Sequence, residues 1–131
     1  MFPVDPADPT PLYAQLERSI RAAIATGRLH VGDRLPTVRQ LAVDLRINAN
    51  TVAKVYAELE RAGVLATQRG IGTFVRESPT PAIATNRRDR ERELRPLVDR
   101  LLADASALGI SLPEILQYLE AVAARYTKEK T

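Results

Sequence analysis

The stretch from Leu35 to Val75 constrains the fold most, because two apolar stripes at helical spacing are separated by only a short break. Apolar residues recur every three or four positions on both sides of the break, a period typical of amphipathic helices. The first stripe is Val38, Leu41, Ala42 and Leu45, and the second is Val52, Val55, Tyr56 and Leu59. We therefore expect two short helices joined by a turn at Arg46–Asn48.

The residues that flank the two stripes favour the same boundaries. Thr37 and Asn48 precede the stripes, and both residue types accept hydrogen bonds from the unpaired N–H groups of a first helical turn. Asn48 also tolerates the backbone bend that a turn needs. Gly63 follows the second stripe, where helices often end on a left-handed residue. Two helices with so short a turn have the spacing of a helix-turn-helix, whose second helix enters a DNA major groove.

The residues after Gly63 predict a β-hairpin. Val64–Ala66 and Thr73–Val75 are apolar or β-branched and suit strands. Gln68–Gly72 lies between them and holds two glycines and one cation. Arg69 would lie at the tip, where glycine lets the backbone approach a phosphate or a minor groove closely. The hairpin would thus form the wing of a winged helix.

Six short motifs in this region are similar to those of one protein family. They are Gly27–Leu29, Gly32–Pro36, Val38–Ala42, Asn48–Val52, Tyr56–Glu60 and Gly70–Val75. With these motifs at these offsets, the chain from about Pro11 to Val75 resembles the winged helix-turn-helix of GntR-family bacterial transcription regulators. The Asn-Ala-Asn-Thr-Val turn and the short remaining tail resemble the YtrA-like subfamily. The resemblance implies operator binding, repression and control of operons for ABC transport systems.

Charge is distributed as DNA binding would require. The chain carries a net charge of +3. Residues 28–76 hold eight cations and four anions, a net charge of +4, so the rest of the chain sums to −1. A local basic excess favours a phosphate backbone through counterion release. The absence of cysteine excludes disulfides and thiolate metal sites, and Met1–Val4 does not open a signal peptide, so we expect a cytoplasmic protein without a cofactor.

The segments before Leu35 are predicted with alternatives. Residues 1–9, rich in proline, predict a flexible lead. Thr10 and Pro11 predict the N-cap and the first residue of a helix. The stripe of this helix is Leu12, Leu16, Ile20, Ala23 and Ile24. We expect Tyr13 in the core, with a DNA contact as the alternative. Leu29 and Val31 predict a short strand beside the wing. We expect His30 to be solvated or hydrogen-bonded and not to be a metal ligand.

The composition changes after the wing, which predicts a second unit. We expect a winged helix over residues 10–76, a linker over 77–86, a helical hairpin over 87–127 and a frayed tail over 128–131. Asn86 suits the cap of the first helix of the hairpin. The mixed charges of Arg87–Arg95 favour a solvated helix face with i,i+4 ion pairs over a nucleic-acid arm.

Three residues or short segments decide the boundaries of the hairpin helices. Pro96 lies inside the first apolar stripe, so the helix either begins there or bends there, and we favour a kink. Gly109 ends that helix, and Ser111–Glu114 has the pattern of a capping box. The predicted fold class is mainly α with a small β-hairpin wing: an N-terminal winged helix-turn-helix followed by a two-helix dimerisation hairpin.

The hairpin has too many apolar positions for two helices to bury alone. Burial against a second copy would cover them, so we expect a homodimer; the alternative is packing onto the chain's own winged helix. The expected interface is Leu97, Leu101, Leu102, Leu108, Ile115, Leu119 and Val122.

The residues expected to contact DNA lie on both helices and the wing. They are Arg34, Thr37, Arg39, Asn48, Asn50, Thr51, Lys54, Arg69, Gly70 and Gly72. Asn50 has the chemistry for a bidentate contact to adenine, and Lys54 suits a phosphate. Asn48 has the alternative of only capping its helix. The resemblance implies a DNA contact for Arg39, and the alternative is a surface ion pair.

One departure from the family pattern matters for specificity. Some GntR relatives carry arginines at the positions of Ala49 and Ala53, so base readout here should depend on amides and hydroxyls. We expect a dimeric repressor that reads an inverted repeat in double-stranded DNA, with a hypothetical small-molecule effector at the dimer interface or between the hairpin and the winged helix. The alternative function is a winged-helix module that binds protein. No grouping of catalytic residue types in the sequence suggests an enzyme.

Overall fold

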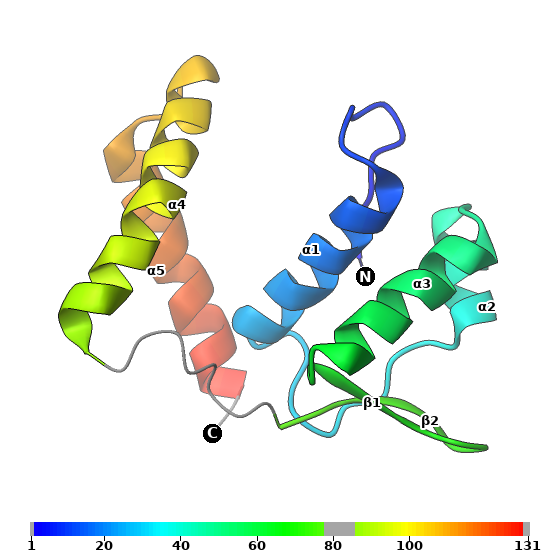
Figure 1. Cartoon of the computed structure of the whole chain (residues 1–131). Helices are drawn as coiled ribbons and strands as arrows, with labels where there is room; N and C mark the ends of the chain where they lie inside the picture. Colours follow the sequence, from blue (N-terminus) through cyan, green and yellow to red (C-terminus); the bar gives the residue numbers. More distant parts are fainter. Residues whose placement is uncertain (1, 78–85, 130–131) are drawn as a thin grey trace. The chain divides into compact units, whose positions relative to one another are not determined.

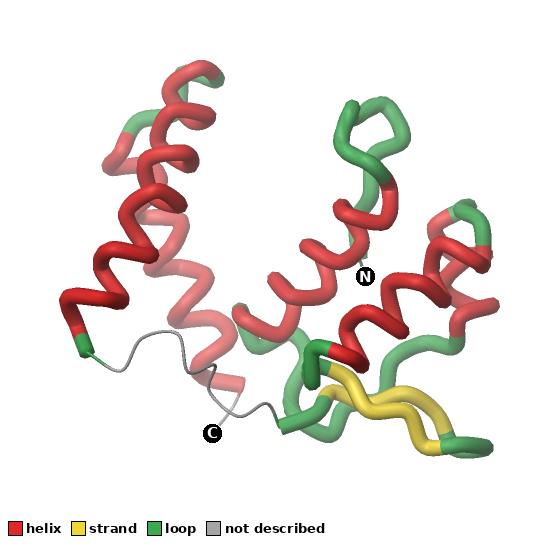
Figure 2. Tube along the Cα trace, viewed as in Figure 1, coloured by secondary structure: helices red, strands yellow, loops and turns green. Residues whose placement is uncertain are grey.

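The computed structural model describes residues 2–77 and 86–129 of the chain (Figures 1 and 2). The elements in order are α1 (Leu12–Ala25), α2 (Val38–Leu45), α3 (Ala49–Arg61), β1 (Leu65–Gln68), β2 (Gly72–Val75), α4 (Arg87–Ala107) and α5 (Leu112–Glu129). They divide into two compact units, Met1–Pro79 and Thr80–Thr131. The predicted fold class, mainly helical with one small hairpin, is confirmed.

The helix-turn-helix forms with the caps that its sequence predicts. The Thr37 hydroxyl accepts from the Gln40 N–H at 3.1 Å, and the Gln40 side chain accepts from the Thr37 N–H at 2.9 Å. Asn48 caps α3 by accepting from the Asn50 N–H at 2.8 Å. The left-handed residue of the turn is Arg46, with φ of 57°, and not Asn48. This conformation costs a non-glycine residue roughly 1–2 kcal/mol.

The core of the first unit lies where α3 packs against α1, α2 and β1 (Figure 1). Its largest fully buried side chains are Phe2, Leu16, Ile20, Leu41, Leu59, Leu65, Val52 and Val55. Apart from Phe2, which precedes α1, each comes from the apolar face of its own helix or strand, as the spacing predicts.

The expectation of a flexible lead does not fit the described residues 2–9. Phe2 is completely buried in the core, and Val4 packs against it. The Asp5 N–H donates to the Gln15 side chain at 2.7 Å, which ties the lead to α1. The predicted cap at Thr10 is also wrong: α1 begins after Pro11 without a side-chain cap.

A third segment pairs with the wing, and this segment lies slightly later in the chain than the strand that we predicted. β1 and β2 are antiparallel, with Leu65 opposite Val75 and Gln68 opposite Gly72. The extra pairing involves Arg34 opposite Phe74, and the Leu35 N–H donates to the Thr73 carbonyl at 2.8 Å. The predicted strand at Leu29–Val31 therefore does not form, because the β2 partner begins only at Gly32.

The second unit is a pair of helices joined by a short turn. Asn86 caps α4 by accepting from the Asp89 N–H, and the Ser111 hydroxyl accepts from the Glu114 N–H at the start of α5. α4 runs through Pro96, so the alternative that it begins there is wrong. α5 reaches Glu129, two residues beyond the predicted hairpin.

Some predictions fall outside the described residues. Most of the expected linker, residues 78–85, is among these, as are Met1 of the lead and residues 130–131 of the tail. Among the described helices, none combines the length and the apolar character that crossing a bilayer requires.

Candidate nucleic-acid interface

α3 presents a polar ridge on the side opposite the core. Val52, Val55 and Leu59 are buried, so the helical period turns Asn50 and Lys54 outward, and both are exposed. Thr51 is half-buried at the edge of this ridge. The exposed amide of Asn50 lies in the first turn of α3, from which a helix in a major groove reaches base edges.

The side-chain oxygen of Asn48 caps α3. That oxygen accepts from the Asn50 N–H, which is the capping role that we expected as the alternative to DNA contact. The side-chain amide N–H groups of Asn48 are not consumed by this bond, because an Asn amide has two donors besides its acceptor oxygen. The capping bond therefore orients the Asn48 side chain and leaves its amide N–H groups able to donate hydrogen bonds.

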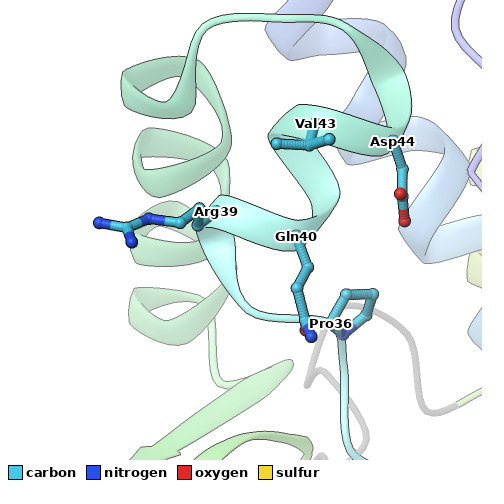
Figure 3. A pocket seen from close by; sticks show the side chains of 5 residues that line it. All are labelled: Pro36, Arg39, Gln40, Val43 and Asp44. Atoms are coloured by element: carbon cyan, nitrogen blue, oxygen red, sulfur yellow. The ribbon is translucent and has the colours of Figure 1, made fainter.

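The start of α2 places Arg39 on the surface. Pro36, Arg39, Gln40, Val43 and Asp44 line an open hollow of about 500 Å³, and Arg39 extends away from the other four (Figure 3). Within the described part of the chain, Arg39, Arg34 and Arg69 form no ion pair. The alternative role of Arg39, a surface salt bridge, is thus not supported by any ion pair among the described residues.

Arg34 lies against the wing at Gly72. A Cβ added to Gly72 would lie 2.7 Å from the Arg34 Nε, so the guanidinium would have to shift if a larger residue stood here. Gly72 also has φ of 147°, a conformation that side-chain-bearing residues rarely adopt. Gly72 therefore leaves room for Arg34 and suits the backbone conformation of the strand.

The tip of the wing is a tight turn that exposes a cation. The Ile71 N–H donates to the Gln68 carbonyl at 2.9 Å across Arg69 and Gly70. Gly70 has φ of 78°, which the third residue of a type II turn requires. Arg69 and Gly70 are exposed, and Ile71 is 56% exposed.

A hollow of about 420 Å³ separates the wing from the start of α2. It is lined by Arg34, Leu35, Thr37, Val38 and the wing residues Thr67–Thr73. Two guanidinium-bearing residues and the Thr37 hydroxyl thus border one space at the N-terminus of α2. Arginine, hydroxyl and helix N-terminus are the groups by which proteins hold phosphate oxygens. We did not predict Thr67, Gln68 and Thr73 as part of this site, although their strand positions beside the glycines could have indicated it.

Lys54 contacts an aromatic ring on α1. Its Nζ lies 4.7 Å from the centroid of the Tyr13 ring, and Tyr13 is 46% exposed. The expectation that Tyr13 packs in the core is therefore wrong, because Leu12 and Leu16 face inward and Tyr13 lies beside their stripe. The ring borders the polar ridge of α3 instead.

Tyr56 connects α3 to the entrance of α2. Its hydroxyl donates to the Pro36 carbonyl at 2.7 Å, while its ring is 6% exposed. Burial raises the pKa of the Tyr56 hydroxyl, because the phenolate would lose hydration. We predicted this residue only as core, since a sequence does not reveal which carbonyl a buried hydroxyl will meet.

The helical unit exposes many apolar side chains. Of the seven expected interface residues, Leu97, Leu101, Leu108 and Leu119 are exposed, whereas Leu102, Ile115 and Val122 are half-buried. Six exposed large apolar residues of this unit were absent from that expected interface. They are Leu94, Val98, Ile110, Leu112, Leu116 and Tyr118. Among these, Leu112 and Leu116 continue with Leu119 at spacings of four and three residues, which indicates one continuous stripe on α5.

The charged start of α4 behaves as the sequence predicts. Arg87–Arg95 is exposed apart from a half-buried Asp89, and Arg87 pairs with Glu91 at 3.1 Å. An exposed i,i+4 pair of this kind contributes only about 0.3–0.5 kcal/mol. The segment is thus a solvated helix face.

Comparisons with known proteins agree with this architecture. The family model for "Bacterial regulatory proteins, gntR family" matches residues 12–75. The HTH-type transcriptional repressor YtrA of Bacillus subtilis (strain 168) is 32% identical over 124 residues, which cover 95% of this chain and 93% of that protein.

Two solved structures extend the likeness to three dimensions. YtrA from Sulfolobus acidocaldarius, a GntR-family transcription factor, has a TM-score of 0.58 at 31% identity, and the match covers 78% of this chain and 97% of that one. AraR(DBD) in complex with operator ORX1 has a TM-score of 0.50 at 28% identity, covering 55% and 89%. The family and its named relatives are transcriptional regulators and not enzymes. The winged helix-turn-helix, its cap motifs and these relatives lead to one conclusion. The chain belongs to the GntR family of bacterial regulatory proteins.

Proposed function

We propose that this protein is a sequence-specific DNA-binding repressor that acts as a homodimer on an inverted repeat. The observation that carries the proposal is the hollow between the wing and α2, where Arg34, Arg69 and Thr37 meet without a carboxylate among the lining residues. An uncompensated cationic hollow beside an exposed polar helix matches the chemistry of a DNA backbone next to an open groove.

The phosphate contacts come from the wing and the start of α2. A phosphate in the hollow would accept hydrogen bonds from the Arg34 guanidinium, which lies close to Gly72. Arg69 would approach the backbone or the minor groove from the wing tip, because Gly70 brings the main chain close. Arg39 would bind a neighbouring phosphate from the outer side of α2. These contacts orient the protein and carry little sequence information.

The base contacts come from α3. Asn50 would pair with N6 and N7 of an adenine, since an exposed amide in the first turn has the matching donor and acceptor. Asn48 and Thr51 flank it, with amide donors and a hydroxyl for bases or phosphates. Ala49 and Ala53 give small, exposed positions beside these polar groups, so a thymine methyl would fit there.

The homodimer is supported by the apolar side chains of the helical unit. Leu97, Leu101, Leu108 and Leu119 are all at least 46% exposed in the single chain. Side chains of this size seldom gather in water without a partner, and a two-fold related copy would bury the same stripe on both sides. Two winged helices would then reach half-sites about one helical turn apart. Leu102, Ile115 and Val122 would contribute less, because they are already half-buried.

Repression follows from occupancy of a promoter by such a dimer. The Bacillus subtilis relative is named a transcriptional repressor, and this chain covers 93% of its length. The resemblance further suggests operons for ABC transport systems as targets. The proposal also includes a small-molecule effector whose binding changes the affinity of the protein for operator DNA. Calorimetry would detect the binding of such a molecule.

The experiment that tests the proposal is selection of bound fragments from the source genome at physiological salt. The proposal predicts enrichment of a few fragments that share an inverted repeat upstream of genes, with the neighbouring genes naming the regulated operon. Asn50→Ala protein should lose this enrichment while it still binds DNA weakly. Uniform recovery of all fragments by the wild-type chain would contradict sequence-specific binding.

A further inference from the structure

The contact between Lys54 and Tyr13 joins two helices across the edge of the proposed interface. Lys54 lies on the exposed ridge of α3, one turn after Asn50, and Tyr13 lies in the first turn of α1. The ammonium is 4.7 Å from the ring centroid, within the range of a cation–π interaction. Residues 41 positions apart in the chain are thus brought together at the surface.

The exposure of both side chains argues against a purely structural role. Lys54 is exposed and Tyr13 is 46% exposed, so their contact buries little apolar area. Within the described residues, Lys54 forms no ion pair that would otherwise hold it. Among the described residues, the contact recorded for the ammonium is therefore the Tyr13 ring.

We propose that Tyr13 is a positioning residue: its ring holds the Lys54 ammonium ready for a DNA phosphate on the α1 side of the groove. This inference rests on the proposed DNA-binding function and adds α1 to the interface. The ring covers one side of the ammonium, and the N–H donors that point away from the ring stay available to phosphate oxygens. Arg34 and Thr37 would hold the backbone from the segment that leads into α2, so DNA would be held on both flanks of α3.

The size of the effect follows from side-chain order. A free lysine loses rotamer freedom when it binds, and this costs about 0.5–1.5 kcal/mol, or about two- to tenfold in affinity at 1.4 kcal/mol per tenfold. A lysine already held on a ring has lost part of that freedom before DNA arrives. Removal of the ring should therefore weaken binding by a factor within this range, on specific and non-specific duplexes alike.

The test is a double-mutant cycle with DNA affinity as the readout. Tyr13→Leu, Tyr13→Phe, Lys54→Met and Tyr13→Leu/Lys54→Met are compared with the full-length wild type by fluorescence anisotropy, on a selected fragment and on a scrambled duplex. Tyr13→Leu should weaken binding about threefold, and Tyr13→Phe should stay within twofold because it keeps the ring. In the Lys54→Met background, Tyr13→Leu should have no further effect.

Each other outcome overturns the inference. Unchanged or tighter binding by Tyr13→Leu would show that the ring does not prepare Lys54 for DNA. Equal losses in Tyr13→Phe and Tyr13→Leu would assign the effect to the hydroxyl, and an undiminished loss in the Lys54→Met background would separate Tyr13 from Lys54. Tyr13→Gln serves as a second ring-free variant if Tyr13→Leu melts below the assay temperature. If wild-type protein fails to prefer any fragment, the proposed function fails, whatever the variants do.

Discussion

Tyr56→Phe removes one oxygen atom from the contact between α3 and the entrance of α2. The hydroxyl donates to the Pro36 carbonyl at 2.7 Å, and the ring is only 6% exposed. Phenylalanine fills the same ring volume, so no cavity forms. The Pro36 carbonyl, however, loses its donor in a part-buried place, which costs more than an ordinary exposed hydrogen bond.

The expected loss of unfolding free energy is about 1–2 kcal/mol, from the net worth of the bond and the unsatisfied acceptor together. For a unit of the size of Met1–Pro79, which contains Tyr56, each loss of 1 kcal/mol in unfolding free energy lowers Tm by roughly 4–8 °C. Urea and thermal unfolding of the full chain, followed by circular dichroism, measure both quantities. Tyr13→Phe is the matched control: the same oxygen is removed from a half-exposed ring, and we expect a change below about 0.5 kcal/mol. Equal stability of Tyr56→Phe and the wild type would refute the reasoning.

Alkaline pH gives an independent check of the same bond. Burial raises the pKa of Tyr56 in the folded state, so above the usual tyrosine value of about 10 the unfolded chain releases this proton first. The stability that Tyr56 contributes is therefore complete below about pH 10 and is lost as pH rises toward the folded-state pKa. The stability gap between wild type and Tyr56→Phe should shrink above pH 10. A gap that stays constant or widens would contradict a buried, neutral hydroxyl.

Three further substitutions test the proposed interface. Asn50→Ala should weaken specific binding by about 1–3 kcal/mol and leave non-specific binding nearly unchanged in anisotropy titrations; equal losses on all sequences would remove Asn50 from base readout. Arg69→Ala should lower the slope of log affinity against log salt by about 1, and an unchanged slope would exclude a phosphate contact. Leu101→Asp should convert the dimer to monomers in sedimentation, whereas an intact dimer would place the interface elsewhere.

Features set by neighbours in the chain could be predicted from sequence. Thr37, Asn48, Asn86 and Ser111 cap the helices that were expected to follow them, because a cap depends on only three or four consecutive residues. The wing could be predicted because Gly70 and Gly72 lie between two segments of strand-forming residues. Helical periodicity separated the buried face of α3 from its polar ridge for the same local reason.

Features that depend on distant partners could not be predicted in this way. Phe2 is a core residue although it lies in a proline-rich lead, since only the folded α1 creates the site that it fills. Tyr13 lies one position from an apolar stripe, and the position of Lys54 decides its contact. Arg46 takes a left-handed turn that its residue type disfavours, because packing of α2 and α3 determines the turn. The close approach of Arg34 to Gly72 likewise requires the assembled wing.

The central claim is that two copies of this chain hold one palindrome at the same time. Sedimentation equilibrium of the full-length protein with a duplex that carries one selected inverted repeat measures this directly. The account predicts a complex of two chains per duplex, and loss of that complex when either half-site is scrambled. One chain per duplex, or two chains that persist on a single half-site, would contradict it.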